Sequence, residues 1–101
     1  MFIYNVTTKA NHSIAAAWLS WLKEEHIPDI INTDCFTHAV VLHLLEADDD
    51  EGITYAVQYH CESKALYNRY IDKHAGEMRK KVSDKWGDKV IAFRSVMQVV
   101  N

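Results

Sequence analysis

The chain has 101 residues, of which 49% are hydrophobic, 25% charged and 11% aromatic, and its formal net charge is −3. This composition is typical of one ordered domain and excludes a disordered chain, and the length is sufficient for a single core. With 11 basic side chains against 14 acidic ones, the chain has no positive excess to neutralise phosphates, so nucleic acid is not expected as a partner.

The first predicted element is a strand over residues 2–8, whose side chains alternate between two faces. A helix is expected to begin near Ser13, with Ser13 or Asn11 able to cap its first amides. Apolar side chains then recur at helical spacing. Pro28 is expected to end this helix about one residue earlier, because proline disfavours the α conformation in the residue before it.

Two apolar runs, residues 37–47 and 53–60, flank an acidic segment that ends in Gly52. The acidic side chains are costly to bury and the glycine permits a turn, so the pattern predicts an antiparallel hairpin. If the turn is centred on Asp49 and Asp50, its position sets which residues of the two strands pair. That register pairs Leu44 with Tyr55, Leu42 with Val57, and Val40 with Tyr59.

The residues after the hairpin predict a helix and a last strand. Ser63 is the N-cap candidate of the helix, and Gly87 is suited to its C-terminal end. Residues 89–100 alternate as a strand. The resulting order, strand, helix, strand, strand, helix, strand, predicts one α+β ferredoxin-like domain over residues 1–101. Its four-stranded antiparallel sheet carries two helices on one face.

The faces of this sheet are predicted from the period of two along each strand. The side chains expected beneath the helices are Tyr4, Val6, Leu42, Leu44, Tyr55, Val57, Ile91 and Phe93. Those expected on the opposite, open face are Ile3, Asn5, Val41, His43, Ala56, Gln58, Arg94 and Val96. This open face is too apolar to remain wetted, so we expect it to pack against the same face of a second copy.

Signals for export or membrane insertion are absent from the sequence. No apolar run approaches the roughly 20 residues of a membrane span. The first residues show neither a basic leader nor a cleavage site. Cys35 and Cys61 are too few for a disulfide framework and are not spaced as a metal pair. We therefore expect a cytoplasmic protein that does not contact membranes.

Several segments resemble a family of short uncharacterised bacterial proteins that is known only as a domain of unknown function. The segments are residues 3–7, 18–29, 52–59, 69–75 and 93–96. The layout also resembles the dimeric α/β-barrel superfamily. That superfamily contains cofactor-free quinone-forming monooxygenases, muconolactone isomerases, haem-degrading enzymes and stress-responsive proteins. The family supplies no catalytic residue, and an activity taken from the fold is an analogy only.

Three polar side chains, Asn5, Gln58 and Arg94, are expected on neighbouring strands of the open face. A guanidinium and two amides can receive a carboxylate or another polar ligand. The alternative is a hydrogen-bond network that fixes the dimer. No acidic side chain on this face suggests a general base, which weakens an enzymatic interpretation.

A second group of candidates surrounds His26, which lies one turn before Asp29 near the helix end. A carboxylate can orient an imidazole as a base, but a histidine at a helix C-terminus is also stabilising without any chemistry. If a pocket opens beneath the helices, His26, Tyr55 and Tyr59 are the catalytic candidates. Other expected lining residues are Trp18, Trp21 and Tyr70, and the alternative is that all of them are core.

No metal or cofactor is expected, because no histidine pair has the spacing of two ligands on a helix. We predict a small-molecule-binding or interaction module. The alternative is a cofactor-independent monooxygenase- or isomerase-like enzyme acting on a small aromatic or carbonyl substrate. A structural dimer without a ligand is the third possibility.

Overall fold

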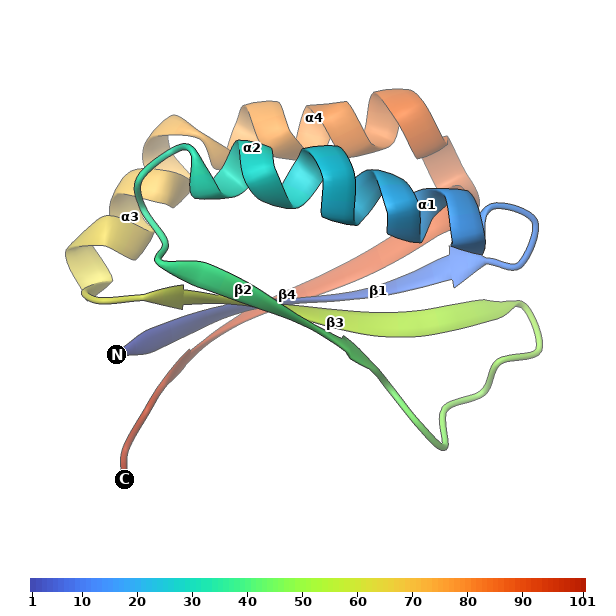
Figure 1. Ribbon diagram of the computed structural model, residues 1–101, viewed down its shortest axis with the longest axis horizontal. Helices are drawn as coiled ribbons and strands as arrows, with labels where there is room; N and C mark the ends of the chain where they lie inside the picture. The colour runs from blue at the N-terminus through green and yellow to red at the C-terminus, as the bar shows by residue number, and fades with distance from the viewer.

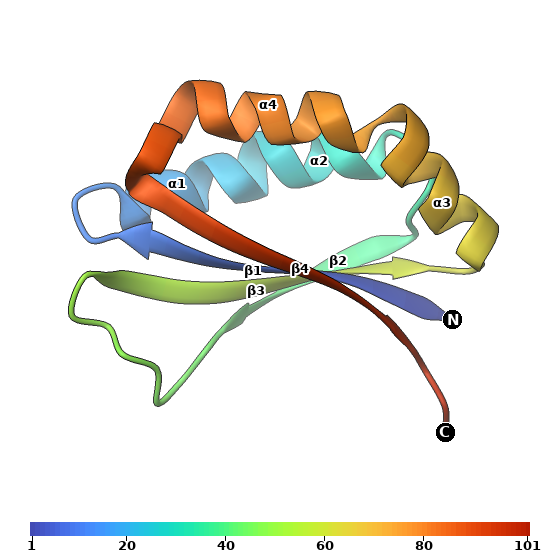
Figure 2. The ribbon, with the colours of Figure 1, turned by 180° about the vertical axis from the view of Figure 1, so that it is seen from behind.

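Four strands form one antiparallel sheet in the computed structural model, which describes residues 1–101. They are β1 (Phe2–Asn11), β2 (His38–His43), β3 (Gly52–Cys61) and β4 (Val90–Gln98), and their order across the sheet is β2-β3-β1-β4. All the helices cover one face of the sheet, as Figures 1 and 2 show from opposite sides. The α+β ferredoxin-like fold expected from the sequence is therefore confirmed.

The first helical segment runs without interruption from Ala15 to Ile31. Its parts are α1 (Ala15–Trp21), the π-helix η1 (Leu22–His26) and α2 (Ile27–Ile31). The prediction that this helix ends before Pro28 is wrong, because Pro28 lies in the first turn of α2.

The π-helix explains how the chain accommodates this proline. The Ile27 amide donates to the Leu22 carbonyl, five residues back, so the turn before Pro28 is wider than an α turn. A proline inside a regular α-helix would lose a hydrogen bond and press its ring against a carbonyl four residues earlier. The wider turn ends at His26, and the His26 side chain is buried on the side of the helix that faces the sheet.

The second helical segment consists of α3 (Lys64–Lys73) and α4 (Ala75–Trp86), and a short 3₁₀ turn (Gly87–Lys89) leads into β4. The predicted N-cap is confirmed, since the Ser63 hydroxyl accepts a hydrogen bond from the Leu66 amide at 3.2 Å. The segment bends at His74, where α3 ends and α4 begins. None of the helices is long and apolar enough to cross a bilayer.

The core between the sheet and the helices is rich in aromatic rings. Tyr4 lies at its centre, with its ring centroid 5.5 Å from that of Tyr70 and 6.0 Å from that of Tyr59. These rings come from β1, β3 and α3, so they join the two layers. Tyr4 and Val57 lie beneath the helices as predicted.

The register of the hairpin corrects the predicted face of β2. Val41 pairs with Val57 and Leu42 with Ala56, one residue away from the expected register. The reason is that β2 already ends at His43, so residues 44–51 form a wider connection in place of a tight central turn. As a result Val41 and His43 face the helices, whereas Leu42 is 41% exposed on the other side.

The side chains of β4 also lie on the faces opposite to those predicted. Val6 pairs with Arg94 and Thr7 with Phe93, so Arg94 and Val96 lie on the helix side. Ile91 and Phe93, which were expected to be buried, are 59% and 71% exposed on the open face. Both faces of β4 carry apolar side chains, and its alternation therefore does not reveal which face meets the helices.

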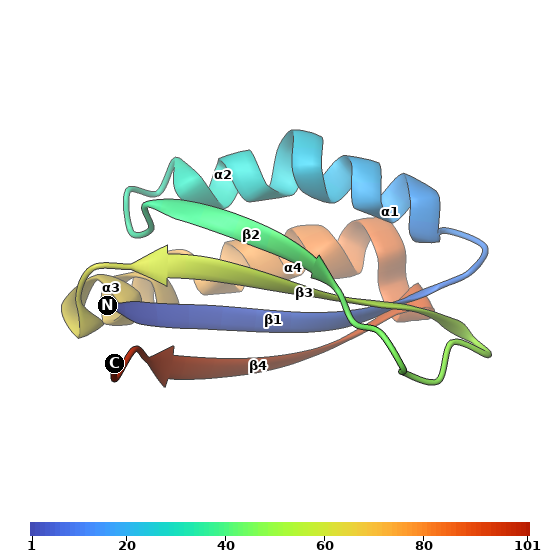
Figure 3. The ribbon, with the colours of Figure 1, turned by 60° about the horizontal axis from the view of Figure 1, so that its bottom comes forward.

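The open face is seen in Figure 3, where the four strands lie side by side in front of the helices. Asn5 and Gln58 lie on this face as expected, directly opposite each other across β1 and β3. In Figures 1 and 2 the β2–β3 connection and the C-terminal end curve away below the sheet, on the side opposite the helices.

Candidate functional site

A cleft lies between the helices and the sheet. It is lined by 17 residues, of which 13 are hydrophobic. Its free space, including the mouth, is about 530 Å³, but only about 40 Å³ of this is wide enough for the centre of a water molecule. Small-molecule sites are ordinarily larger, with volumes of roughly 300–1,000 Å³. The cleft is therefore a narrow apolar slot that side chains largely fill.

The polar side chains of this cleft come from both layers. The strands supply Tyr4, Thr8, Tyr59 and Arg94, and the helices supply His26, Tyr70 and Arg79. The lining contains two arginines and no aspartate or glutamate. Its charge is therefore positive, although the chain as a whole is negative.

His26 is the most strongly perturbed histidine of the chain. Only 8% of its surface is exposed, its ring stacks on Trp21 with 4.6 Å between centroids, and its buried Nδ1 atom has no hydrogen-bond partner. Burial lowers the pKa of His26 to about 4, and the nearby positive charges of Lys81 and Arg94 act in the same direction, against Asp29. The imidazole is therefore neutral at pH 7.

Two buried tyrosines, Tyr59 and Tyr70, also line the cleft. Burial raises the pKa of both phenols above their usual value of 10, and neighbouring tyrosines add to the effect. Both phenols are therefore protonated at physiological pH. They can donate or accept hydrogen bonds but do not act as phenolate bases.

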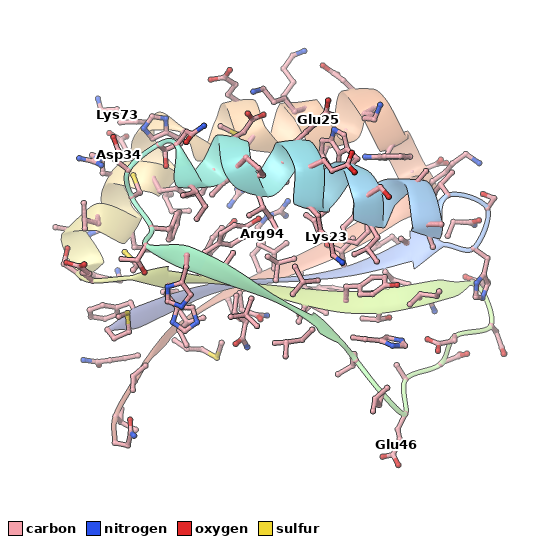
Figure 4. The ribbon with its side chains drawn as sticks, in the orientation of Figure 1. Lys23, Glu25, Asp34, Glu46, Lys73 and Arg94 are labelled. Carbon is pink, nitrogen blue, oxygen red and sulfur yellow. The ribbon has the colours of Figure 1, made fainter.

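Arg94 lies at the mouth of the cleft. Arg94 lines both the cleft and a shallow groove between α4 and β4. In Figure 4 its side chain lies between the sheet and the helices. Arg69 and Arg79, the other arginines, donate hydrogen bonds within the chain. Arg94 forms no such bond and no ion pair.

The structure separates the predicted ligand-binding residues. Asn5 and Gln58 are paired on the open face, where the Asn5 Nδ2 atom donates to the Thr7 hydroxyl at 2.9 Å. Arg94 lies on the other side of the sheet. The three side chains therefore do not converge on one ligand within a single chain.

The predicted catalytic candidates are only partly brought together. His26 and Tyr59 both line the cleft. Tyr55 is outside it and stacks on Trp18, with 5.7 Å between ring centroids. Asp29 forms an ion pair with Lys81 at 3.4 Å and makes no hydrogen bond to the His26 imidazole.

Arg79 and Tyr4 belong to the site but were not recognised from the sequence as polar site residues. The Arg79 guanidinium donates to the Tyr4 hydroxyl at 3.3 Å across the two layers. Arg79 stands beside Lys80 and Lys81 in the sequence, and nothing in its spacing distinguishes it from these surface lysines.

No three histidine, cysteine, aspartate or glutamate side chains gather in a way that could hold a metal ion. Two histidines, His38 and His60, lie directly opposite each other across β2 and β3. Their rings stack with 4.2 Å between centroids.

Residues 1–100 match the family model described as "Domain of unknown function (DUF4286)". The chain belongs to the DUF4286 family. The resemblance to a family of unknown function is thus confirmed, and that family assigns no activity to this DUF4286 chain. None of the curated proteins matches it.

Solved structures share the fold of this DUF4286 chain at low sequence identity. A dimeric ferredoxin-like protein from an uncultured marine organism has 11% identity and a TM-score of 0.75, covering 99% of this chain and 95% of its own. SnoaB, a cofactor-independent oxygenase from Streptomyces nogalater, has 12% identity and a TM-score of 0.67, covering 99% and 94%. A second dimeric ferredoxin-like protein from an uncultured marine organism has 14% identity and a TM-score of 0.62, covering 99% and 98%. At these identities the similarity shows the fold alone.

Proposed function

We propose that this DUF4286 protein is a homodimeric small-molecule-binding module whose ligand occupies the cleft beneath the helices. The observation that carries the proposal is the composition of the cleft. An apolar, aromatic slot contains a buried His26 Nδ1 atom without a partner and two buried phenols, Tyr59 and Tyr70. Buried polar groups ordinarily have partners, and a few convergent polar groups in an apolar pocket are typical of a ligand site.

The protonation states of these groups favour binding over proton transfer. A general base works best when its pKa is close to the operating pH. Burial holds the pKa of His26 at about 4, and it raises the pKa values of Tyr59 and Tyr70. These three side chains are therefore neutral donors and acceptors, which orient a ligand well but remove protons poorly.

The homodimer is proposed to form through the open face of the sheet. This face exposes large apolar side chains along both edge strands, among them Leu42 on β2 and Ile91 and Phe93 on β4. Exposed apolar surface of this kind marks an interaction site, and two-fold self-association is the commonest solution. Two structures with the same fold are described as dimeric ferredoxin-like proteins.

In such a dimer Asn5 and Gln58 lie at the centre of the interface, because β1 and β3 are the inner strands of the sheet. We assign them to polar contacts between the two copies and not to the ligand in the cleft. Both cysteines, Cys35 and Cys61, are free and buried, which supports a reducing compartment such as the cytoplasm.

The binding proposal is tested by calorimetric titration with three probes that share one ring system: 2-naphthoate, 2-naphthamide and 2-naphthylmethylammonium. At least one probe is expected to bind with one molecule per chain. The variant Ala92→Trp should abolish this binding, because Ala92 lines both the cleft and the groove at its mouth. The control Ala65→Trp introduces the same ring on the exposed side of α3. The absence of saturable binding, or equal loss in both variants, would overturn the proposal.

A cofactor-independent monooxygenase- or isomerase-like activity is the second candidate. It is favoured by the presence of His26 and Tyr59 in one cleft. Dioxygen uptake with 1,4-dihydroxynaphthalene separates the two candidates. If the protein is a binding module, the wild-type protein and the His26→Gln variant should take up dioxygen at the same rate. Faster uptake by the wild-type protein would establish an enzyme that depends on His26.

A further inference from the structure

The cleft contains one cationic group that the protein itself leaves unpaired. Of the two arginines that line it, Arg79 donates to the Tyr4 hydroxyl, whereas Arg94 has no hydrogen-bond or ion-pair partner within the chain. A guanidinium presents five N–H donors in a planar fork, which matches a carboxylate with two parallel hydrogen bonds.

The surroundings of Arg94 strengthen its selectivity for an anion. No acidic side chain lines the cleft, so no internal carboxylate competes for the guanidinium. His26 contributes no charge at pH 7, because burial holds its pKa at about 4. An anion at this site would therefore meet one free guanidinium, a second guanidinium that is already hydrogen-bonded, and neutral groups.

The depth of the cleft decides how such an anion can lie. The interior is formed by buried residues such as Trp18, Tyr59 and Tyr70, whereas Arg94 stands at the exposed mouth. Burying an unpaired charge among apolar side chains is costly, so the charged end of a ligand stays at the mouth and its apolar part enters. A flat ring is the apolar group best matched to a slot this narrow, because it can stack on the aromatic side chains that line it.

We infer that the cleft selects a planar aromatic monocarboxylate, whose ring enters between the aromatic side chains and whose carboxylate is held by Arg94 at the mouth. This inference rests on the proposed binding function and adds to it the chemical class of the ligand. The free Arg94 fork offers the two parallel hydrogen bonds that a planar carboxylate accepts.

The test compares the same three naphthyl probes on the wild-type dimer. The wild-type protein should bind 2-naphthoate roughly tenfold or more tightly than 2-naphthamide, as a charge-assisted pair at a partly exposed site allows. It should bind 2-naphthylmethylammonium least well. Because Arg94 is exposed, the preference for 2-naphthoate should shrink as sodium chloride is raised.

Substitution of the arginine then assigns this preference to one side chain. Arg94→Gln should reduce the affinity for 2-naphthoate to that for 2-naphthamide, and Arg94→Lys should restore part of the difference. Lys89→Gln removes the same charge from an exposed residue outside the cleft and should leave the preference unchanged. Circular dichroism confirms that each variant is folded.

Equal binding of 2-naphthoate and 2-naphthamide, each blocked by Ala92→Trp, would overturn the anion assignment and leave the binding function intact. A preference for 2-naphthoate that survives Arg94→Gln would overturn the role of Arg94. Tighter binding of 2-naphthyl phosphate than of 2-naphthoate would overturn the choice of a monocarboxylate. If no probe binds, the proposed function fails together with this inference.

Discussion

Arg94 lies directly opposite Val6 in the ladder between β4 and β1, and this pairing places both side chains on the helix side of the sheet. The alternation of β4 alone had suggested that Arg94 belongs with Asn5 and Gln58 on the open face. Its actual position joins it to His26 and Tyr59 in one cleft. The only arginine without a partner in the chain thus belongs to the apolar cleft and not to the proposed dimer interface.

The first prediction separates a ligand-binding role of Arg94 from a structural one. Arg94→Ala removes no hydrogen bond or ion pair, so the free energy of unfolding should change by less than about 0.5 kcal/mol and the dimer should persist. Arg79→Ala is the matched control, because it removes the bond to the Tyr4 hydroxyl and should cost about 1 kcal/mol. Urea unfolding and light scattering measure both quantities. Dissociation of the Arg94→Ala protein into monomers would assign the arginine to the interface.

The second prediction concerns the open face. Phe93→Asp introduces a charge at an apolar position of β4 that we place within the interface, so this variant should be a monomer at micromolar concentration. Ile71→Asp makes the same type of change on the exposed surface of α3 and should remain a dimer. Sedimentation velocity distinguishes the two states. A wild-type protein that sediments as a monomer would contradict the proposed assembly.

The third prediction follows from the lowered pKa of His26. The unfolded state takes up a proton below pH 6.5, but the folded state does so only near pH 4, where burial has placed the pKa. Above pH 6.5 His26 is neutral in both states, and its protonation does not reduce the free energy of unfolding. As the pH falls from 6.5 to about 4, uptake of a proton by the unfolded state alone lowers the free energy of unfolding by about 3 kcal/mol, because one pKa unit corresponds to about 1.4 kcal/mol.

Urea unfolding between pH 4 and pH 7 measures this effect, with His26→Gln as the control that removes the imidazole while other titrating groups are kept. The dependence of stability on pH should be weaker in the variant over this range. Proton NMR of the wild-type protein should show that the His26 imidazole titrates near pH 4. Equal slopes for both proteins would mean that His26 is not held neutral by burial.

The fourth prediction uses two glycines in opposite environments. A Cβ atom on Gly52 would lie 2.3 Å from the backbone carbonyl oxygen of Ala10, where β3 passes close to β1, whereas a Cβ atom on Gly76 would meet nothing within 4 Å. Gly52→Ala should therefore destabilise the protein by about 2 kcal/mol or more. Gly76→Ala lies inside α4 and should stabilise it by about 0.5–1 kcal/mol. Thermal unfolding of both variants checks the difference, and similar effects would contradict the close approach of the two strands.

Local patterns in the sequence account for most of the fold. The order of the elements, the Ser63 N-cap and the faces of β1 and β3 could be predicted because alternation, caps and turn residues act between neighbours in the chain. The continuation of the first helix through Pro28 could not be predicted. It depends on a π turn, and no residue type marks such a turn reliably.

The candidate site shows where local patterns stop being informative. The sequence by itself determined that Arg94 and Phe93 point to opposite sides of β4, since the period of a strand is two. Only the tertiary structure decided which of them meets the helices. Both faces of this edge strand carry apolar side chains, so its side is set by the hydrogen-bonded ladder to β1, a contact between residues almost the whole chain apart.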